Sequence, residues 1–320
     1  MGDQSNLVRE LCNKYKYSPY MIERYVNLFG EERVKKFLDG NEQKILTTFK
    51  VNTLRINKDV LFNRLNAKGF ELEPISVVPD AFYVKKAPFS IGATTEYLLG
   101  YYYIQSLSSM IPSLALNVSS HDIVVDMCSA PGGKTIHLAQ LMKNQGVILA
   151  FELNRERMRS FRSNISRCGV QNVIAIRTDA ANLPDLHIKG ISKILLDAPC
   201  TGSGLIPVDP SRKTSRTFGD IKFCSSIQMK LMKAAVEGLE RGGELVYSTC
   251  SIEPEENEYI INNVLQQFRL EVVDLDINFG EPGLTNVFGL ELSPEVEKAR
   301  RLYPYLHKTE GFFVCKLKKV

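Results

Sequence analysis

The chain has 320 residues, 44% of them hydrophobic and 24% charged, and its 40 Lys and Arg against 36 Asp and Glu give a net charge of +4. This length and composition are typical of a globular protein with a sizeable core, and so small a net charge permits a nucleic-acid partner without requiring one. No run of about 18 apolar residues exists, so we expect no membrane span. The polar N-terminus lacks the apolar core of a signal peptide.

The cysteines number seven, are scattered, and are never spaced C-x-x-C. This pattern argues against a disulfide framework and against a zinc site, and it favours a reducing, cytoplasmic setting. The four histidines are scattered as well, so we expect no metal centre.

The first hundred residues predict a small α+β domain, residues 1–100. Two helices come first, and Ser18-Pro19 suits the start of the second one. An alternation typical of strands then surrounds a helix that Gly69 stops. In chain order, the expected elements are helices at 7–16 and 19–39, a strand at 50–56, a helix at 58–68, and strands at 70–78 and 81–85.

Residues 101–320 predict a second domain, of the α/β class. A helical connector at 101–117 opens it, and apolar strand-like runs then alternate with helices. The expected strands lie at 122–127, 147–151, 172–177, 192–197, 243–248, 269–275 and 311–317, and the expected helices at 134–143, 155–168, 221–240 and 254–268. The alternation predicts a Rossmann-like sheet of about seven strands with helices on both faces, its first five strands ordered 3-2-1-4-5. Ligands bind at the carboxyl ends of such strands.

The first strand of this sheet runs into the turn CSAPGGKT. Its glycines, Gly132 and Gly133, would let a ligand approach the backbone, and the following helix would offer free N–H groups to an anion or carboxylate. The turn is similar to the end of a P-loop, but Cys128 stands where a P-loop needs its first glycine. A nicotinamide site is disfavoured because G-x-G-x-x-G is absent. A tight turn that binds nothing is the remaining alternative.

An acidic residue ends each of the next three strands: Glu152, Asp179 and Asp197. Alone, each would more often be a solvated loop residue or a helix cap. Together with the glycine turn, they suit a ligand that carries ribose hydroxyls, an adenine amino group, a cationic group and a carboxylate. S-adenosylmethionine has all four, so we predict it as the cofactor.

Two cysteines follow the fourth and fifth strands, Cys200 in DAPCTGSG and Cys250 in VYSTCSIEPEENE. These strands are neighbours in the predicted order, so both thiols would face one pocket, although a free cysteine is usually a small buried hydrophobe. Methylation of pyrimidine C5 needs such a pair. One thiolate adds to C6 and makes C5 nucleophilic, an acid forms hydrogen bonds with N3 and the exocyclic amine, and a second group removes the C5 proton so that the thiolate can leave.

Three segments, DMCSAPGGKT, DAPCTGSG and VYSTCSIEPEENE, resemble the motifs of the RNA cytosine-5 methyltransferases of the Fmu/NSUN type, in the same order. The resemblance covers most of residues 95–320, and FKVNTLRI is similar to that family's N-terminal segment. It implies that Cys250 is the nucleophile, that Cys200 helps to release the product, and that Asp197 is a catalytic residue near both cofactor and base. DNA cytosine-5 methyltransferases instead use the Pro-Cys thiol as nucleophile. The positions that match cofactor-binding residues of the family are Cys128, Ser129, Ala130, Pro131, Gly132, Gly133, Lys134, Glu152, Arg157, Asp179 and Asp197.

The resemblance also implies an RNA partner, in which single-stranded or flipped-out cytosines are the reachable targets. The N-terminal domain has 15 Lys and Arg against 12 Asp and Glu, a net charge of +3, and would serve as an RNA platform. Arg212, Lys213 and Arg216 either hold phosphates or belong to a solvated loop, and most arginines of 155–168 are interpreted as a solvated face. We expect tRNA, on the breadth of the family and the compactness of the chain. The alternatives are ribosomal RNA, an inactive RNA-binding protein, and methylation of a protein or an exocyclic amine.

Overall fold

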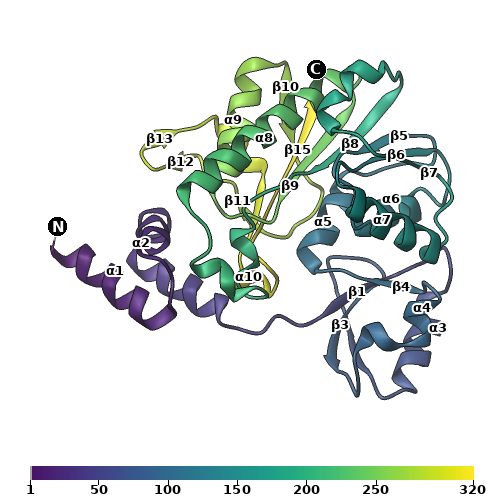
Figure 1. The fold of residues 1–320 in the computed structure, drawn as a ribbon, viewed down its shortest axis with the longest axis horizontal. Helices are drawn as coiled ribbons and strands as arrows, with labels where there is room; N and C mark the ends of the chain where they lie inside the picture. Colours follow the sequence, from purple (N-terminus) through teal and green to yellow (C-terminus); the bar gives the residue numbers. More distant parts are fainter. Residues whose placement is uncertain (1) are drawn as a thin grey trace.

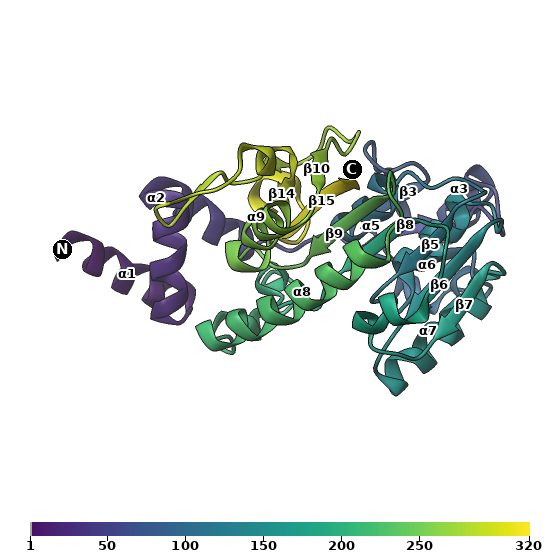
Figure 2. The ribbon, with the colours of Figure 1, turned by 90° about the horizontal axis from the view of Figure 1, so that it is seen from above.

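The computed structural model describes residues 2–320, which form three parts (Figure 1). Two helices make the N-terminal part, a four-stranded sheet with short helices makes the second, and a nine-stranded sheet flanked by helices makes the third. Figure 2 shows the N-terminal helices beyond one end of the large sheet, with helix α7 (Arg155–Cys168) and strand β7 (Val173–Ile176) at the other end. Within the described residues, no helix combines the length and apolarity needed to cross a membrane.

Helices α1 (Gly2–Tyr15) and α2 (Pro19–Asn41) form the N-terminal part. Pro19 occupies the first turn of α2, where its missing N–H leaves no helical hydrogen bond unmade. The buried side chains of these helices pack on the third part, and the ring centroids of Phe37 and Tyr303 lie 6.2 Å apart. The two helices therefore contact the third part, which contains the nine-stranded sheet, although the small sheet follows them directly in sequence.

The small sheet is antiparallel, with strand order β2-β3-β1-β4. The ring centroid of Phe49 lies 5.6 Å from that of Phe82 and 4.8 Å from that of Tyr102, and these three rings form the centre of its core. Its elements are β1 (Thr48–Val51), α3 (Lys58–Asn66), β2 (Glu71–Pro74), β3 (Ala81–Lys86), α4 (Thr95–Leu98) and β4 (Tyr102–Ile104).

The predicted helical connector at 101–117 is wrong in its first part. Residues Tyr102–Ile104 form β4, which pairs with β1, and only Leu107–Ala115 form a helix, α5. Two tyrosines and an isoleucine favour a strand because they fit a half-buried pleated surface. The partner strand, about fifty residues earlier in the chain, supplies that surface and decides the outcome.

The large sheet confirms the predicted fold class. Its strand order is β11-β14-β15-β9-β8-β5-β6-β7, and β10 pairs with β15 as well. The five parallel strands follow the predicted 3-2-1-4-5 order, and β15 runs antiparallel beside β9. All seven predicted strands form. Two short strands, β11 and β14, extend the edge and were not predicted, because they contain Pro and Arg and lack apolar alternation. The strands are β5 (Ile123–Asp126), β6 (Val147–Phe151), β7, β8 (Ile191–Asp197), β9 (Glu244–Thr249), β10 (Leu270–Val273), β11 (Glu281–Pro282), β14 (Arg300–Leu302) and β15 (Phe312–Lys319).

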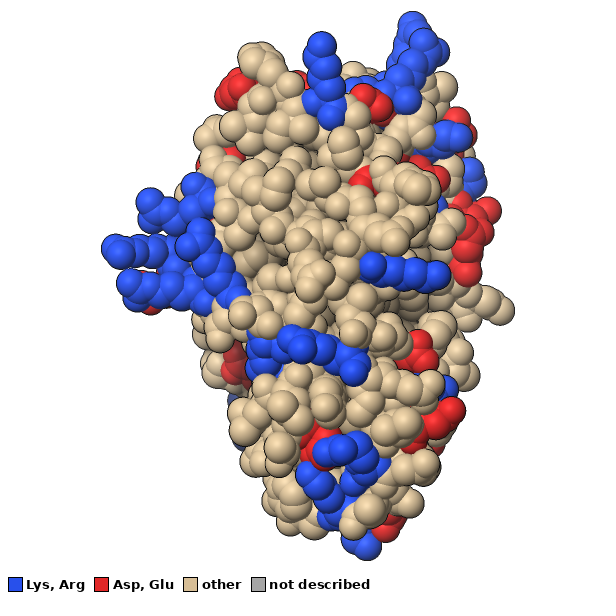
Figure 3. All heavy atoms as spheres, turned by 90° about the vertical axis from the view of Figure 1, so that its right-hand side faces the viewer, with Lys and Arg blue, Asp and Glu red and all other residues tan. Residues whose placement is uncertain are grey.

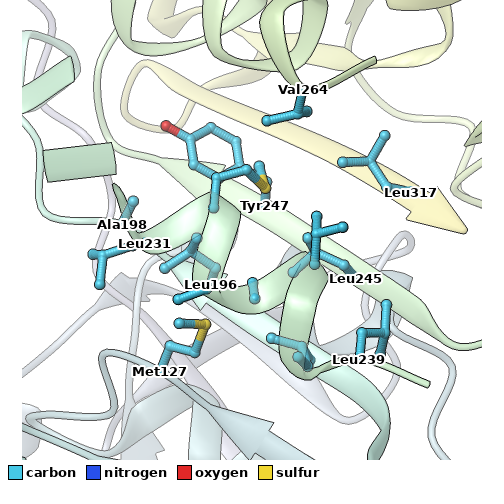
Figure 4. Close-up of a cluster of buried hydrophobic side chains, with 14 of the residues drawn as sticks. Met127, Leu196, Ala198, Leu231, Leu239, Leu245, Tyr247, Val264 and Leu317 are labelled. Atoms are coloured by element: carbon cyan, nitrogen blue, oxygen red, sulfur yellow. The ribbon is translucent and has the colours of Figure 1, made fainter. Parts of the chain in front are cut away.

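Helices cover both faces of the large sheet, which gives it two hydrophobic layers. Successive strand residues face opposite sides, so Leu195 packs in the layer formed with α5 and α6, while Leu196 packs in the layer formed with α8 and α9. Figure 4 shows the second layer, where Leu196, Leu231 and Tyr247 lie together. The remaining elements are α6 (Gly133–Leu141), α8 (Phe218–Gly238), α9 (Glu258–Gln267), α10 (Pro304–His307) and the hairpin of β12 (Asn286–Val287) with β13 (Leu290–Glu291).

Candidate active site

The carboxyl ends of the parallel strands border a cavity of about 820 Å³. A second cavity, of about 200 Å³, lies beside the glycine turn, and Cys128 and Asp197 border both cavities. The predicted residues that line the larger cavity are Cys128, Glu152, Arg157, Asp179, Asp197, Cys200 and Cys250. Those that line the smaller one are Cys128, Ser129, Ala130, Pro131, Gly132, Gly133, Lys134 and Asp197. The sheet thus brings every predicted site residue to one edge.

The glycine turn between β5 and α6 is tied to the neighbouring strand β6. Ser129 donates its N–H and its hydroxyl to the carbonyl of Phe151, at 2.9 and 3.0 Å. Gly132 has a φ of +115°, in the left-handed region that favours glycine. A Cβ atom at Gly133 would stand 2.8 Å from the ring of Tyr103 in β4. The small sheet therefore packs directly on the turn. The positive φ requires a glycine at 132 and the contact with Tyr103 requires one at 133, whether or not a ligand approaches them.

Glu152 follows β6 and is almost completely buried. Its carboxylate accepts a hydrogen bond from the N–H of Asn154 at 2.8 Å and lies 3.5 Å from the guanidinium of Arg157. Arg157 also donates to the carbonyl of Ala130 at 2.6 Å, so it links the end of β6 to the glycine turn. A carboxylate has about four acceptor positions, and these two contacts leave some of them for the hydroxyls of a ligand.

Asp179 follows β7 at the far side of the cavity. It accepts a hydrogen bond from the N–H of Ala181 at 3.0 Å, and its other oxygen lies 3.0 Å from the ammonium of Lys230. The Ala181 hydrogen bond and, after it, Lys230 lower the pKa of Asp179. Asp179 thus caps the short helical turn that follows it, the alternative role expected for a lone acid, and it lines the cavity as well.

Asp197, the last residue of β8, has a partner on each oxygen. The ammonium of Lys134 lies 2.7 Å from Oδ2, and the hydroxyl of Ser248 donates to Oδ1 at 2.7 Å. Ser248 is fully buried on β9, directly opposite Asp197 in the strand register. Ser248 was not predicted from the sequence, because only the register of β8 and β9 places it beside Asp197. Asp197 is therefore fixed between the glycine turn and the strand that leads to Cys250.

Cys200 and Cys250 lie together at the ends of β8 and β9. Their sulfur atoms are 3.1 Å apart, both side chains are partly exposed, and both line the larger cavity. The hydrogen bond with Cys250 and, after it, burial raise the pKa of Cys200. Cys200 is thus held in a setting that favours its protonated form.

The loop that follows Cys200 is held mainly by contacts within the protein. Arg212 and Arg216 both donate to the carbonyl of Thr201, at 2.7 and 2.9 Å. Lys213 pairs with Glu42 just beyond the end of α2, at 2.6 Å. Phosphate binding by these three residues stays a prediction, and any phosphate would compete with these partners.

Basic side chains gather in separate groups on the face that Figure 3 shows. In helix α7, Arg155, Arg159 and Arg162 are exposed, as expected for a solvated face. Arg167 differs, because its guanidinium lies 4.2 Å from the ring centroid of Tyr97 and donates to the Tyr97 carbonyl at 2.7 Å. Arg167 thereby joins α7 to α4, beside the small sheet.

The larger cavity suits a nucleoside-sized cofactor. Its volume falls within the range of about 300–1,000 Å³ that is usual for small-molecule sites, and it has a buried acceptor, Glu152, at the end of β6 and a partly exposed one, Asp179, at the end of β7. These acceptors match ribose hydroxyls and an adenine amino group, and the nearby helix N-terminus matches a carboxylate. The fold and the arrangement of these groups are those of the class of methyltransferases that depend on S-adenosylmethionine.

Two family models match the chain. One, described as 16S rRNA methyltransferase RsmB/F, matches residues 113–318, and the other, the N-terminal domain of 16S rRNA methyltransferase RsmF, matches residues 19–107. The chain belongs to the RsmB/F family of RNA cytosine-C5 methyltransferases, the NSUN/Fmu type, and the resemblance stated from the three motifs is confirmed.

Two known relatives cover most or nearly all of the chain. The 28S rRNA (cytosine-C(5))-methyltransferase of Mus musculus is 38% identical over 98% of this chain, and the tRNA (cytosine(72)-C(5))-methyltransferase of Pyrococcus horikoshii is 41% identical over 72% of it. The solved structure of a methyltransferase homolog from Pyrococcus horikoshii superposes with a TM-score of 0.90 at 45% identity, covering 98% of this chain and 99% of that one. The chain spans 40% of the mouse relative and 56% of the Pyrococcus tRNA relative.

Proposed function

We propose that this protein transfers a methyl group from S-adenosylmethionine to C5 of cytosine in structured RNA, through a covalent bond between Cys250 and C6. The observation that carries the proposal is the pair of thiols, 3.1 Å apart, in the wall of the cofactor-sized cavity. C5 and C6 are adjacent ring atoms, so two thiols at this separation can act on both. Methylation of a protein or of an exocyclic amine needs no such pair, and an inactive RNA-binding protein would not need to keep it.

We assign the attack on C6 to Cys250, which makes C5 nucleophilic. The raised pKa of Cys200 supports this order, because Cys200 holds its proton more tightly than an ordinary thiol. Asp197 binds N3 and the exocyclic amine of the base, a role supported by its position beside both cavities. S-adenosylmethionine, when bound, supplies an electrophilic methyl group for C5. Cys200 loses its own proton to water before elimination; its thiolate, a strong base, then accepts the C5 proton, and Cys250 leaves C6 as a thiolate while the ring double bond forms again.

We assign the cofactor contacts to the residues predicted for them. Glu152 and Asp179 receive hydrogen bonds from the nucleoside, which their remaining acceptor positions support. Lys134 and Arg157 fix the turn and the strand ends through their contacts with Asp197 and Ala130. The other assigned residues form the turn itself: Cys128, Ser129, Ala130, Pro131, Gly132 and Gly133.

We propose tRNA as the substrate class. The tRNA methyltransferase of Pyrococcus horikoshii has the higher identity of the two curated relatives described above, which supports this choice. Ribosomal RNA is the second candidate, because the mouse 28S rRNA enzyme matches a larger share of the chain and both family models carry 16S rRNA descriptions. Residues 1–100 would contribute the RNA platform, with residues 101–320 as the catalytic domain. Because both thiols must be reduced to react, we place the enzyme in the cytoplasm.

Tritium transfer from labelled S-adenosylmethionine to unmodified tRNA and rRNA transcripts tests the proposal. We expect label in RNA, and bisulfite sequencing should then reveal one or a few protected cytosines. Transfer to rRNA alone would favour the second candidate. The absence of transfer to either RNA would contradict RNA methylation, and full activity of a Cys250→Ala variant would point to an exocyclic amine or a protein instead.

A further inference from the structure

Glu256 is a fully buried carboxylate that lies behind the two cysteines and outside the lining of both cavities. It ends the short helical turn Pro254–Glu256. Four donors surround it. Oε1 accepts from the N–H of Thr201 at 2.9 Å and from the amide of Gln228 at 3.0 Å, while Oε2 accepts from the hydroxyls of Thr201 and Ser251, each at 2.5 Å.

These donors belong to both cysteine-bearing loops. Thr201 directly follows Cys200, and Ser251 directly follows Cys250. Gln228, on α8, also donates to the carbonyl of Pro199 at 2.9 Å. A single carboxylate therefore holds residues next to both thiols, although the two cysteines lie fifty positions apart in the sequence.

We propose that Glu256 is a positioning residue, which sets the relative placement of Cys200 and Cys250. The inference rests on the proposed function, in which one sulfur bonds to C6 and the other takes the proton from the adjacent C5. Both sulfurs must then hold their places through several steps, and misplacement of a reacting group by about 1 Å can cost about a hundredfold in rate.

The contact pattern favours this role over one in general packing. The two loops could have been joined by apolar side chains, which would need no buried acceptor. Instead, the Thr201 N–H, two hydroxyls and an amide all depend on one carboxylate, and loss of a common acceptor in a buried network displaces several groups at once. A glutamine of the same shape can keep most of these hydrogen bonds, because its carbonyl oxygen can accept from the Thr201 N–H and the Gln228 amide and its own amide can donate to the two hydroxyls.

The test compares Glu256→Ala, Glu256→Gln and a matched control, Glu244→Ala. Glu244 is a half-buried carboxylate at the opposite end of β9, paired with Lys193 and Lys316. We expect Glu256→Ala to lower kcat about a hundredfold, with the Kd for S-adenosylmethionine unchanged within twofold. Glu256→Gln should recover activity to within about tenfold of wild type. Glu244→Ala should lower the thermal midpoint but leave kcat unchanged.

A second readout uses the covalent RNA adduct. In a Cys200→Ala background, added Glu256→Ala should slow the formation of the adduct by Cys250 to the same degree as it lowers kcat. If Glu256→Ala does not fold, Thr201→Val and Ser251→Ala replace it, since each removes one hydroxyl donor, and each should lower kcat about tenfold.

The results separate this inference from the proposed function. If folded Glu256→Ala, or both hydroxyl variants, had the kcat of the wild type, the positioning role would be wrong. RNA methylation by the wild-type protein would still support the proposed function in that case. If Glu256→Ala lost as much affinity for S-adenosylmethionine as it lost in kcat, the positioning role would also be wrong, because such a result would indicate general disruption of the site. Wild-type protein that methylates no RNA would instead remove the proposed function itself.

Discussion

Replacement of each cysteine by alanine should separate the two thiol roles. Cys250→Ala removes the atom that bonds to C6, so we expect neither methyl transfer nor a covalent RNA adduct. Cys200→Ala leaves Cys250 in place, so attack and methyl transfer should still occur. The C5 proton then lacks the acceptor that lay 3.1 Å from the attacking sulfur, and the methylated adduct should accumulate.

The size of the effect follows from the role of the missing base. Removal of a positioned general base slows a proton transfer by about 10²- to 10⁴-fold. Starting from a typical turnover of about 10 s⁻¹, breakdown of the adduct would then take roughly 10 to 1,000 s. An SDS gel run after rapid denaturation detects a species of that lifetime as a slowly migrating band. Cys12→Ala is the matched control, because this partly exposed thiol lies on α1 outside the cavity lining.

The opposite pattern would refute the assignment. An adduct with Cys250→Ala and none with Cys200→Ala would make Cys200 the nucleophile, which is the role of the Pro-Cys thiol in DNA cytosine-5 methyltransferases. An adduct with neither variant, from protein that methylates RNA when unmodified, would show that attack needs both thiols.

Three further predictions concern the carboxylates and Ser248. Glu152→Ala and Asp179→Ala should each weaken S-adenosylmethionine binding, because loss of a hydrogen-bond partner in a partly buried site costs about 1–3 kcal/mol, or roughly tenfold to a hundredfold in affinity. Calorimetric titration measures the affinity, and an unchanged value for both variants would contradict the cofactor assignment. Ser248→Ala should lower kcat about tenfold, since it removes one of the two groups that fix Asp197; steady-state kinetics measure this, and an unchanged kcat would mean that Lys134 alone suffices. Burial raises the pKa of Asp126 from 3.8 to about 6, so between these pH values the folded state binds more protons than the unfolded state, and the free energy of unfolding falls as pH rises through them. Asp126→Asn should remove about 3 kcal/mol of this fall. Urea unfolding at about pH 4 and about pH 7.5 measures the fall, and an equal fall in wild type and variant would contradict the reasoning.

The sequence was sufficient to predict the parallel strands and what lies at their ends. A run such as Ile194-Leu195-Leu196 is apolar on both sides, as a strand buried under helices on both faces must be, and five such runs fix a sheet whose carboxyl ends meet. That geometry brought Glu152, Asp179 and Asp197 to one edge without any knowledge of side-chain contacts.

Contacts that depend on register or on another domain were beyond the sequence. Ser248 opposes Asp197 only because β8 and β9 pair with one particular alignment, and a shift of one residue would turn it to the other face. The sequence suggested that Gly133 is a glycine so that a ligand can approach the backbone. In the structure, the ring of Tyr103 from the small sheet also leaves no room for a side chain at this position. Arg167 belongs to a helix face that looks solvated, and only the fold brings Tyr97 beneath it.

The loop that carries Cys250 is fixed from outside as well as from within. Arg24 of α2 donates to Glu253 at 2.8 Å and to Glu255 at 2.7 Å, and its side chain is only 15% exposed. An attack on C6 requires the sulfur to stand about 3–3.5 Å from the ring carbon in the correct direction, a geometry that an unrestrained loop would adopt only briefly. Arg24 restrains this loop from the N-terminal helices, and Glu256 ties it to the loop of Cys200. The helices at the start of the chain thus bear on the placement of the nucleophile without approaching the substrate pocket.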